Sequence, residues 1–126
     1  MKLEHVAINV HHPEAMAAWY QEHLGMKIVM AQTTGTRMHF LADDGGSMIE
    51  LYNNPAGPIF DYAATDPFSL HFAFSTTDIE SDRARRIAAG ASPIGEISEA
   101  PAAKLAFLRD PWDTPIQLVT RAKALI

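Results

Sequence analysis

The segment Leu3-Glu4-His5-Val6-Ala7-Ile8 has a second copy, Ser69-Leu70-His71-Phe72-Ala73-Phe74, which begins 66 residues later in the chain. Both segments alternate bulky apolar residues with small or polar ones, and their histidines occupy the same position. An alternation with a period of two is typical of a β-strand that buries one face. The two segments therefore predict one kind of strand that occurs twice, which indicates an internal repeat.

Further matched blocks follow the two strands in the same order. At an offset of 67 residues, Phe40-Leu41-Ala42-Asp43 matches Phe107-Leu108-Arg109-Asp110, and Ile49-Glu50-Leu51 matches Ile116-Gln117-Leu118. In each copy a glycine, Gly25 or Gly90, also follows an apolar periodic run, as at the end of a helix. These matches indicate two copies of one structural unit.

Each copy is expected to fold as β-α-β-β-β. The first strand is predicted over residues 3 to 10 and 69 to 75, and the helix over 13 to 23 and 78 to 89. Pro13 suits a first helical turn, and Thr77 with Glu80 has the spacing of a capping box. The remaining strands are predicted over residues 26 to 32, 36 to 42, 47 to 52, 94 to 98, 104 to 109 and 114 to 120. The predicted fold class is α+β, with two tandem βαβββ modules that form a curved mixed sheet covered by helices on the outside.

The domain organisation follows from the length of 126 residues and the hydrophobic content of 48%. Module one is expected over about residues 1 to 53, a connector rich in turn-forming residues over about 54 to 67, and module two over about 68 to 126. Because modules of this size are near the lower limit for an independent core, we expect a single domain, 1 to 126, or pairing of modules across a dimer.

Composition excludes several classes of function. The net charge of −5 disfavours binding to nucleic acid or to anionic lipid. Since the chain has no cysteine, it cannot form a disulfide scaffold, an iron–sulfur cluster or a thiol nucleophile. No signal peptide or membrane-spanning stretch is evident, so a cytoplasmic protein is expected.

The strand patterns place four polar side chains on the faces opposite the bulky aliphatic residues. Alternation separates His5 and His71 from the apolar residues of the first strands, and separates Glu50 and Gln117 from those of the last strands. Imidazole nitrogen together with oxygen donors suits a borderline divalent metal. The four residues are therefore predicted to form one metal-binding constellation.

Paired βαβββ modules with His on the first strand and Glu or Gln on the last resemble the vicinal oxygen chelate superfamily. This superfamily includes glyoxalase I, methylmalonyl-CoA epimerase, extradiol dioxygenases, fosfomycin resistance proteins and bleomycin resistance proteins. The resemblance covers nearly the whole chain and includes a final hairpin, Asp110 to Leu118, in which the position of Gln117 is most often glutamate in the family. It implies a glyoxalase-like fold and one divalent metal per site, which would be Ni, Co, Zn, Mn or Fe.

The resemblance implies three functions that remain open. The first is a metal-dependent lyase or isomerase that chelates vicinal oxygens of a small carbonyl substrate and stabilises an enediolate. Since Gln117 cannot act as a base at neutral pH, Glu50 would be the catalytic residue. The second is a non-haem Fe(II) ring-cleaving dioxygenase that uses two histidines and one carboxylate. The third is a non-catalytic protein that binds a small, antibiotic-like molecule.

Three further residues are candidates for contact with the small-molecule substrate. Arg37 and Lys104 occupy matched repeat positions and could receive an anionic group, although solvated strand charges are an alternative. Tyr52 shares a strand face with Glu50. A homodimer is also expected, and the sequence leaves open whether the site lies within one chain or is shared between two.

Overall fold

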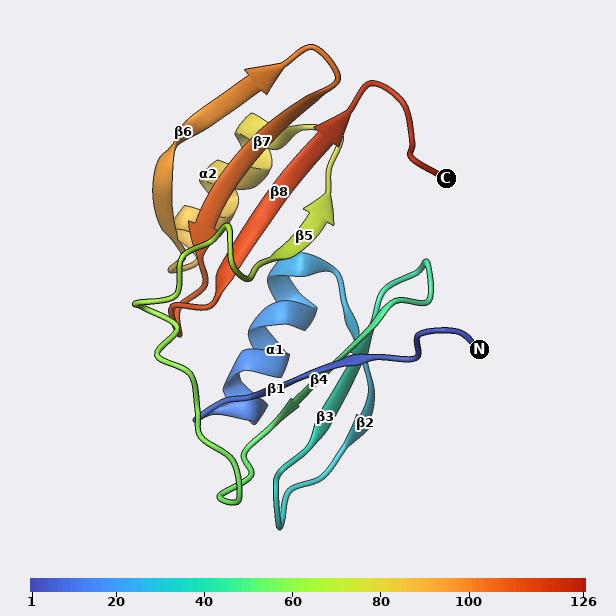
Figure 1. Cartoon of the computed structure of the whole chain (residues 1–126), viewed down its shortest axis with the longest axis vertical. Coiled ribbons are helices and arrows are strands. Elements are labelled where there is room, and N and C mark those ends of the chain that lie inside the picture. The colour runs from blue at the N-terminus through green and yellow to red at the C-terminus, as the bar shows by residue number, and fades with distance from the viewer. The chain divides into compact units, whose positions relative to one another are not determined.

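A computed structural model of the chain describes all 126 residues. The chain divides into two compact units, Met1–Phe60 and Asp61–Ile126. Each unit contains one helix and one sheet of four strands (Figure 1). Neither helix is long and apolar enough to span a membrane.

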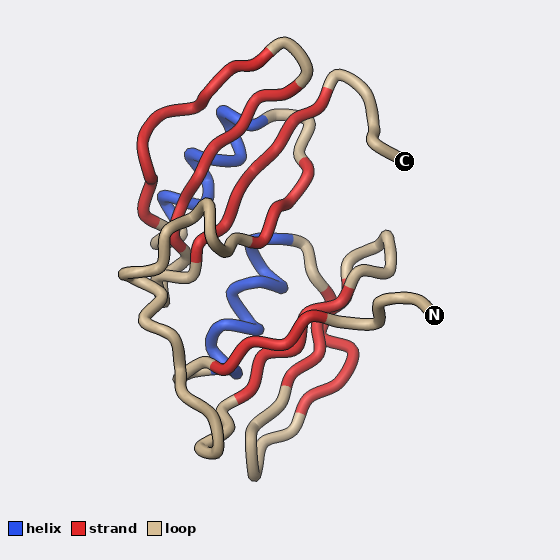
Figure 2. Tube along the Cα trace, viewed as in Figure 1, coloured by secondary structure: helices blue, strands red, loops and turns tan.

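The first unit begins with a strand and a helix that are followed by three strands. Its elements are β1 (Val6–Asn9), α1 (Pro13–Leu24), β2 (Lys27–Ala31), β3 (His39–Ala42) and β4 (Met48–Tyr52). The strand order is β1-β4-β3-β2, in which β1 pairs with β4 in parallel and the other neighbours are antiparallel. The strands of this sheet are red in Figure 2.

The second unit repeats this topology. Its elements are β5 (Phe72–Ser75), α2 (Ile79–Ala88), β6 (Ser92–Ala100), β7 (Ala103–Arg109) and β8 (Pro115–Arg121). The order is β5-β8-β7-β6, and β5 is parallel to β8. The predicted α+β class and the two tandem βαβββ modules are confirmed, with the strands arranged as two four-stranded mixed sheets.

Several predicted boundaries differ from the structure. The strands β1 and β5 begin at Val6 and Phe72 rather than at residues 3 and 69, so His5 and His71 directly precede the strands on which they were predicted. The strand β6 is longer than predicted and spans Ser92–Ala100.

Two further differences have local reasons. The strand β3 starts at His39 rather than at residue 36, because a turn closed by the Arg37 N–H and the Thr34 carbonyl at 3.1 Å precedes it. Helix α2 is capped one residue later than the predicted Thr77, since the Asp78 carboxylate accepts from the Ser81 N–H at 3.1 Å. The predicted helix start at Pro13 is confirmed, and Gly25 ends α1 in the left-handed conformation.

Each helix packs against one face of its own sheet and covers the aliphatic residues of the strands (Figure 1). In the first unit, Leu41 and Leu51 are fully buried together with Met16 and Tyr20 of α1. In the second unit, Leu108 and Ile116 are fully buried on the same side as Ile79 of α2. We call the opposite face of each sheet its donor face, because it carries Glu50 in the first unit and Gln117 in the second.

An aspartate holds the last hairpin of each unit. The Asp43 carboxylate accepts from the Ser47 N–H at 2.8 Å, and that of Asp110 accepts from the Thr114 N–H at 2.9 Å. Both hairpins contain a residue in the left-handed region, which is Gly46 in the first and residue 113, an aspartate, in the second. Aspartate tolerates this conformation better than most residues do. The repeated Asp in the matched sequence blocks therefore has a structural cause.

The predicted connector is shared between the two units. Its first part is tied to β1, since the Asn9 amide donates to the carbonyls of Asn54 and Gly57, both at 2.9 Å. Its second part is tied to β7, because the Arg109 guanidinium donates to the carbonyls of Tyr62 and Thr65 at 2.6 and 2.9 Å. The connector residues are thus ordered by polar contacts within each unit.

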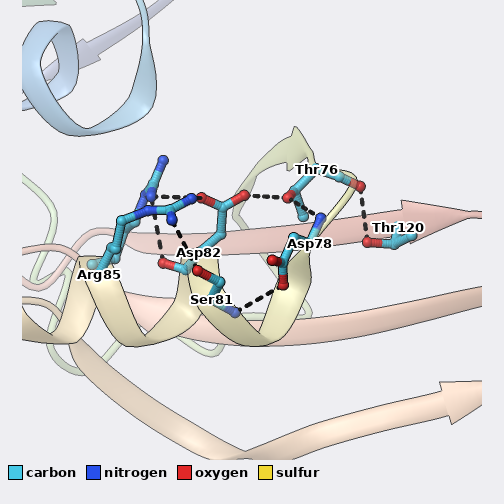
Figure 3. Close-up of polar contacts among 7 residues, drawn as sticks. Thr76, Asp78, Ser81, Asp82, Arg85 and Thr120 are labelled. Atoms are coloured by element: carbon cyan, nitrogen blue, oxygen red, sulfur yellow. Dashed lines mark hydrogen bonds and ion pairs between the residues drawn. The ribbon is translucent and has the colours of Figure 1, made fainter.

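A half-buried carboxylate, Asp82, joins α2 to the loop after β5 (Figure 3). It accepts hydrogen bonds from the Thr76 hydroxyl and from Arg85 and Arg86, the last two at 2.5 and 2.7 Å. The Thr120 hydroxyl of β8 in turn donates to the Thr76 carbonyl at 2.8 Å. Burial opposes ionisation, but the hydrogen bonds from Thr76 and Arg85 and the charge of Arg86 hold the pKa of Asp82 below its ordinary value.

We expect Asp82→Asn to lower the free energy of unfolding by about 1.5–3 kcal/mol at neutral pH, the range for a hydrogen bond to a charged group. A carboxyl whose pKa is lower in the folded state contributes stability above its unfolded pKa and loses that contribution as the pH falls. The difference between the wild type and Asp82→Asn should therefore shrink from about pH 5 downward. Urea denaturation at several pH values measures it.

The matched control is Asp44→Asn. Asp44 also forms an ion pair, with Lys27 at 2.5 Å, but both side chains are largely exposed. This variant should change stability little, because exposed pairs contribute little. An equal loss in both variants, or a loss at Asp82 that is independent of pH, would contradict the assignment.

Candidate metal and substrate site

The donor face of the first unit brings His5 and Glu50 together. Parallel pairing places Ala7 opposite Glu50, and His5 lies two residues before Ala7 on the same face. The His5 Nε2 atom is 3.3 Å from Glu50 Oε2, while Glu4 Oε2 lies 2.7 Å from His5 Nδ1. The imidazole is therefore held from one side and turns its second nitrogen toward the strand carboxylate.

The second unit repeats the strand register that relates His71 to Gln117. Ala73 is opposite Gln117 in the parallel ladder, and His71 lies two residues before Ala73. The His71 Nδ1 atom is 2.7 Å from the Pro67 carbonyl oxygen, which can only accept a hydrogen bond. Nδ1 therefore carries the proton, which leaves the lone pair of Nε2 available to a ligand.

A phenylalanine supports each histidine ring. The ring of His5 meets that of Phe40 edge to face at a centroid distance of 5.1 Å, and His71 meets Phe107 in the same way at 5.3 Å. Phe40 is the strand neighbour of Glu50, and Phe107 that of Gln117. The sequence analysis did not select these phenylalanines, although they belong to the matched blocks and so carried a signal.

The Gln117 side chain supplies the candidate oxygen donor of the second unit. The residue is only 8% exposed and occupies the position equivalent to Glu50. The buried side-chain atoms that lack a hydrogen-bond partner belong to other residues, Arg83, Arg86 and Thr114. The amide oxygen of Gln117 is therefore a possible ligand to an ion, but its burial does not by itself require one.

The donor chemistry fits a divalent metal in each unit taken by itself. Imidazole and oxygen ligands bind such an ion at about 2.0–2.2 Å, which separates two ligand atoms by roughly 3 Å. The 3.3 Å between His5 Nε2 and Glu50 Oε2 is compatible with this arrangement. The structure contains no group of three or more His, Cys, Asp or Glu side chains that could hold a metal. Each unit thus supplies two of the four predicted donors.

The predicted substrate residues Arg37 and Lys104 both form ion pairs with the helix of their own unit. Arg37 contacts Glu14 of α1 at 3.2 Å, and Lys104 contacts Glu80 of α2 at 3.0 Å. The hydrogen bond from Lys104 to Glu80 lowers the pKa of Glu80 and raises that of Lys104. The structure therefore does not bring these two cations to the donor faces, and their contact with substrate stays a prediction.

Tyr52 is half-buried on the same face of β4 as Glu50, where the sequence pattern placed it. Its role in substrate binding is likewise still a prediction.

His39, by contrast, is buried on the helix side of β3, and its Nδ1 atom lies 2.8 Å from the Arg37 carbonyl. A cavity of about 650 Å³ lies at the carboxyl-terminal ends of β5 and β8. Its lining includes Ser75, Thr77, Val119 and Arg121.

Comparison with protein families shows to which superfamily the chain belongs. The sequence profile of the glyoxalase/bleomycin resistance protein/dioxygenase superfamily matches residues 2–118. The chain belongs to this superfamily. The match spans both modules of this superfamily member and includes all four predicted donors. A comparison with curated protein sequences finds no match.

Solved structures share the fold of this superfamily member at low sequence identity. A glyoxalase family protein from Bacillus cereus superimposes with a TM-score of 0.81 at 19% identity, over 98% of this chain and 95% of the other. TnmS3, an antibiotic binding protein from Streptomyces sp. CB03234, gives 0.70 at 23% identity, over 97% and 99%. The fosfomycin resistance protein FosX from Listeria monocytogenes gives 0.73 at 14% identity, over 99% and 95%.

The hydrogen bond to Pro67 predicts the tautomer of His71. In the metal-free protein, the nitrogen-15 chemical shifts of the neutral ring should show a protonated Nδ1 and a bare Nε2, because the carbonyl requires a donor. Two-dimensional NMR of selectively labelled histidine measures this. A proton on Nε2 would contradict the geometry. His11, which is exposed, serves as the comparison and should show the ordinary mixture of tautomers.

Proposed function

We propose that this protein is a metal-dependent lyase or isomerase of the glyoxalase or epimerase type. Its site would consist of His5, Glu50, His71 and Gln117, with the two pairs contributed by one chain or by two copies. The observation that carries the proposal is the 3.3 Å approach of His5 Nε2 to the Glu50 carboxylate. The matching strand register of the second unit, in which His71 comes two residues before the partner of Gln117, supports it.

The four proposed donors would hold a metal ion, and the metal would stabilise negative charge on the substrate. A divalent metal, when bound, would polarise two neighbouring substrate oxygens and stabilise negative charge that develops on them. Two neutral imidazoles, one carboxylate and one amide leave such a site with a net single positive charge, which favours an anionic intermediate. His5 and His71 would hold and orient this centre, and both rings are fixed by the edges of Phe40 and Phe107.

Glu50 would accept the proton from the carbon next to the substrate carbonyl. It is the one carboxylate among the four donors, and its side chain is 16% exposed, so solvent screens it little. Gln117 cannot take a proton at neutral pH, so the direction of proton transfer would be set by the first module. The two modules would thus have different roles because the equivalent positions 50 and 117 carry a glutamate and a glutamine.

The glutamine at position 117 also favours a second candidate function, the binding of a small molecule without catalysis. Because Gln117 leaves the second module without a carboxylate, the site could bind a small molecule without turning it over. The structural likeness to the antibiotic binding protein TnmS3 is compatible with this alternative. Metal content separates the two functions, because a binding protein of this fold does not need the four-donor set.

We expect the purified protein to bind one Ni, Co, Zn or Mn ion per site after reconstitution, and His71→Ala to lose it, because one imidazole ligand is removed. Elemental analysis after gel filtration gives the stoichiometry. His11→Ala is the control, since this exposed histidine lies outside the predicted set and should retain the metal. Iron instead of these metals would direct the next assay to oxygen uptake with catechols.

The absence of specific metal from the wild type under all conditions would overturn the four-donor site. It would leave the ligand-binding alternative. Equal loss of metal in His71→Ala and His11→Ala would also contradict the assignment, because it would indicate adventitious binding to surface imidazoles.

We expect Glu50→Gln to slow proton abstraction by at least about 100-fold, the usual contribution of a positioned general base. The readout is the incorporation of solvent deuterium into dihydroxyacetone, a small α-hydroxy ketone, followed by NMR with the metal-loaded protein. Glu22→Gln is the control because Glu22 is largely exposed on α1. Full exchange activity in Glu50→Gln would show that another group takes the proton.

A further inference from the structure

The connector presents an exposed aromatic ring beside the second donor pair. Phe68 is 84% exposed, and its ring lies 5.4 Å from that of Phe107 at an interplanar angle of 65°. Phe107 in turn contacts the ring of His71 and is the strand neighbour of Gln117. The two phenylalanines and His71 thus form a continuous row of rings that ends in an uncovered one.

The backbone under Phe68 is fixed. The Phe68 N–H donates to the Asp66 carboxylate at 2.8 Å, and the Ser69 N–H donates to the Asp66 carbonyl at 2.9 Å. The next turn is closed by the hydrogen bond from His71 Nδ1 to the Pro67 carbonyl. A ring held in this way loses little conformational freedom when it contacts a ligand, so the contact is pre-organised.

The fold itself does not require this ring. The first module supports His5 with Phe40 alone, and the residue that corresponds to Phe68 in the repeat is Lys2. Two rings, His71 and Phe107, therefore suffice to build the duplicated arrangement. Phe68 is an addition of the second module that leaves most of an apolar side chain in water, and its uncovered face is open to a ligand.

We propose that Phe68 forms one wall of the substrate pocket and stacks against a planar aromatic part of the substrate. The inference rests on the proposed function, because it names the substrate class of the same site. Aromatic rings favour edge-to-face or offset contacts with other rings beyond the effect of buried area. Phe68 already makes such a contact on one side, and its exposed side offers the same kind of surface to a ligand.

A small molecule fits this surface better than a second copy of the chain. Asp66 and Ser69, which flank the pair Pro67-Phe68 in the chain, are polar and exposed. A single ring can bury at most roughly 150–250 Å². A stable protein interface needs about 800 Å² from each partner. The isolated ring therefore suits one flat ligand group, and the oligomeric state is a separate outcome of the test.

The test compares 2-naphthol with decahydro-2-naphthol, which has the same carbon skeleton without aromatic rings. Neither probe needs a metal, so the result is independent of whether the four-donor site exists. We expect the metal-free protein to bind 2-naphthol at least about fivefold more tightly, and Phe68→Leu to abolish this preference. NMR titration that follows the amides of Ser69 and His71 measures both affinities.

Two controls complete the design. Phe60→Leu removes another exposed ring, 64% accessible, and should keep the preference for 2-naphthol. Phe68→Leu should keep the thermal stability and the elution volume of the wild type because the ring it removes is exposed. Equal affinity for the two probes, an unchanged preference in Phe68→Leu, or a change in its oligomeric state would overturn the inference. Metal binding by the wild type, measured separately, tests the proposed function alone.

Discussion

The parallel pairing of the first and last strands of each module is the constraint on which the candidate site depends. It places Ala7 opposite Glu50 and Ala73 opposite Gln117. His5 then lies 3.3 Å from the Glu50 carboxylate, and His71 contacts Phe107, the strand neighbour of Gln117. Because side chains alternate along a strand, a shift of one residue in either ladder would move the donor to the helix side. The helix on the aliphatic face thus secures the register that assembles the donors.

The two copies share structural features but differ at the candidate site. An acidic residue of each helix pairs with a cation, Arg37 just before β3 or Lys104 in β7, and an aspartate closes each final hairpin. At matched positions the copies differ, with Glu50 against Gln117 on the donor faces and Lys2 against Phe68 in the segments before β1 and β5. The first module therefore has the only strand carboxylate of the donor set, and the second has the exposed ring. We propose that one handles the proton and the other contacts the substrate.

Most of the fold could be predicted because period-two alternation and the repeat act together. Ile49 and Leu51 identified the buried face, and Glu50 followed on the other. The sequence did not identify the helix cap where two neighbouring residues could fill that position. Thr77 was predicted to cap α2, but Asp78 does so. The matched positions of Arg37 and Lys104 reflect ion pairs with the helices, which strand alternation alone does not reveal. Phe68 has no counterpart in the repeat, so no pattern in the sequence singled it out.

The central proposal is that His5 and His71, from one chain or from two copies, bind the same ion. X-ray absorption spectroscopy of the metal-loaded protein tests it most directly, because scattering from imidazole rings reports how many of them bind the metal. The account predicts two imidazoles per metal, from His5 and His71, with the remaining ligands being oxygen. A single imidazole per metal would contradict it and would mean that each module binds metal separately.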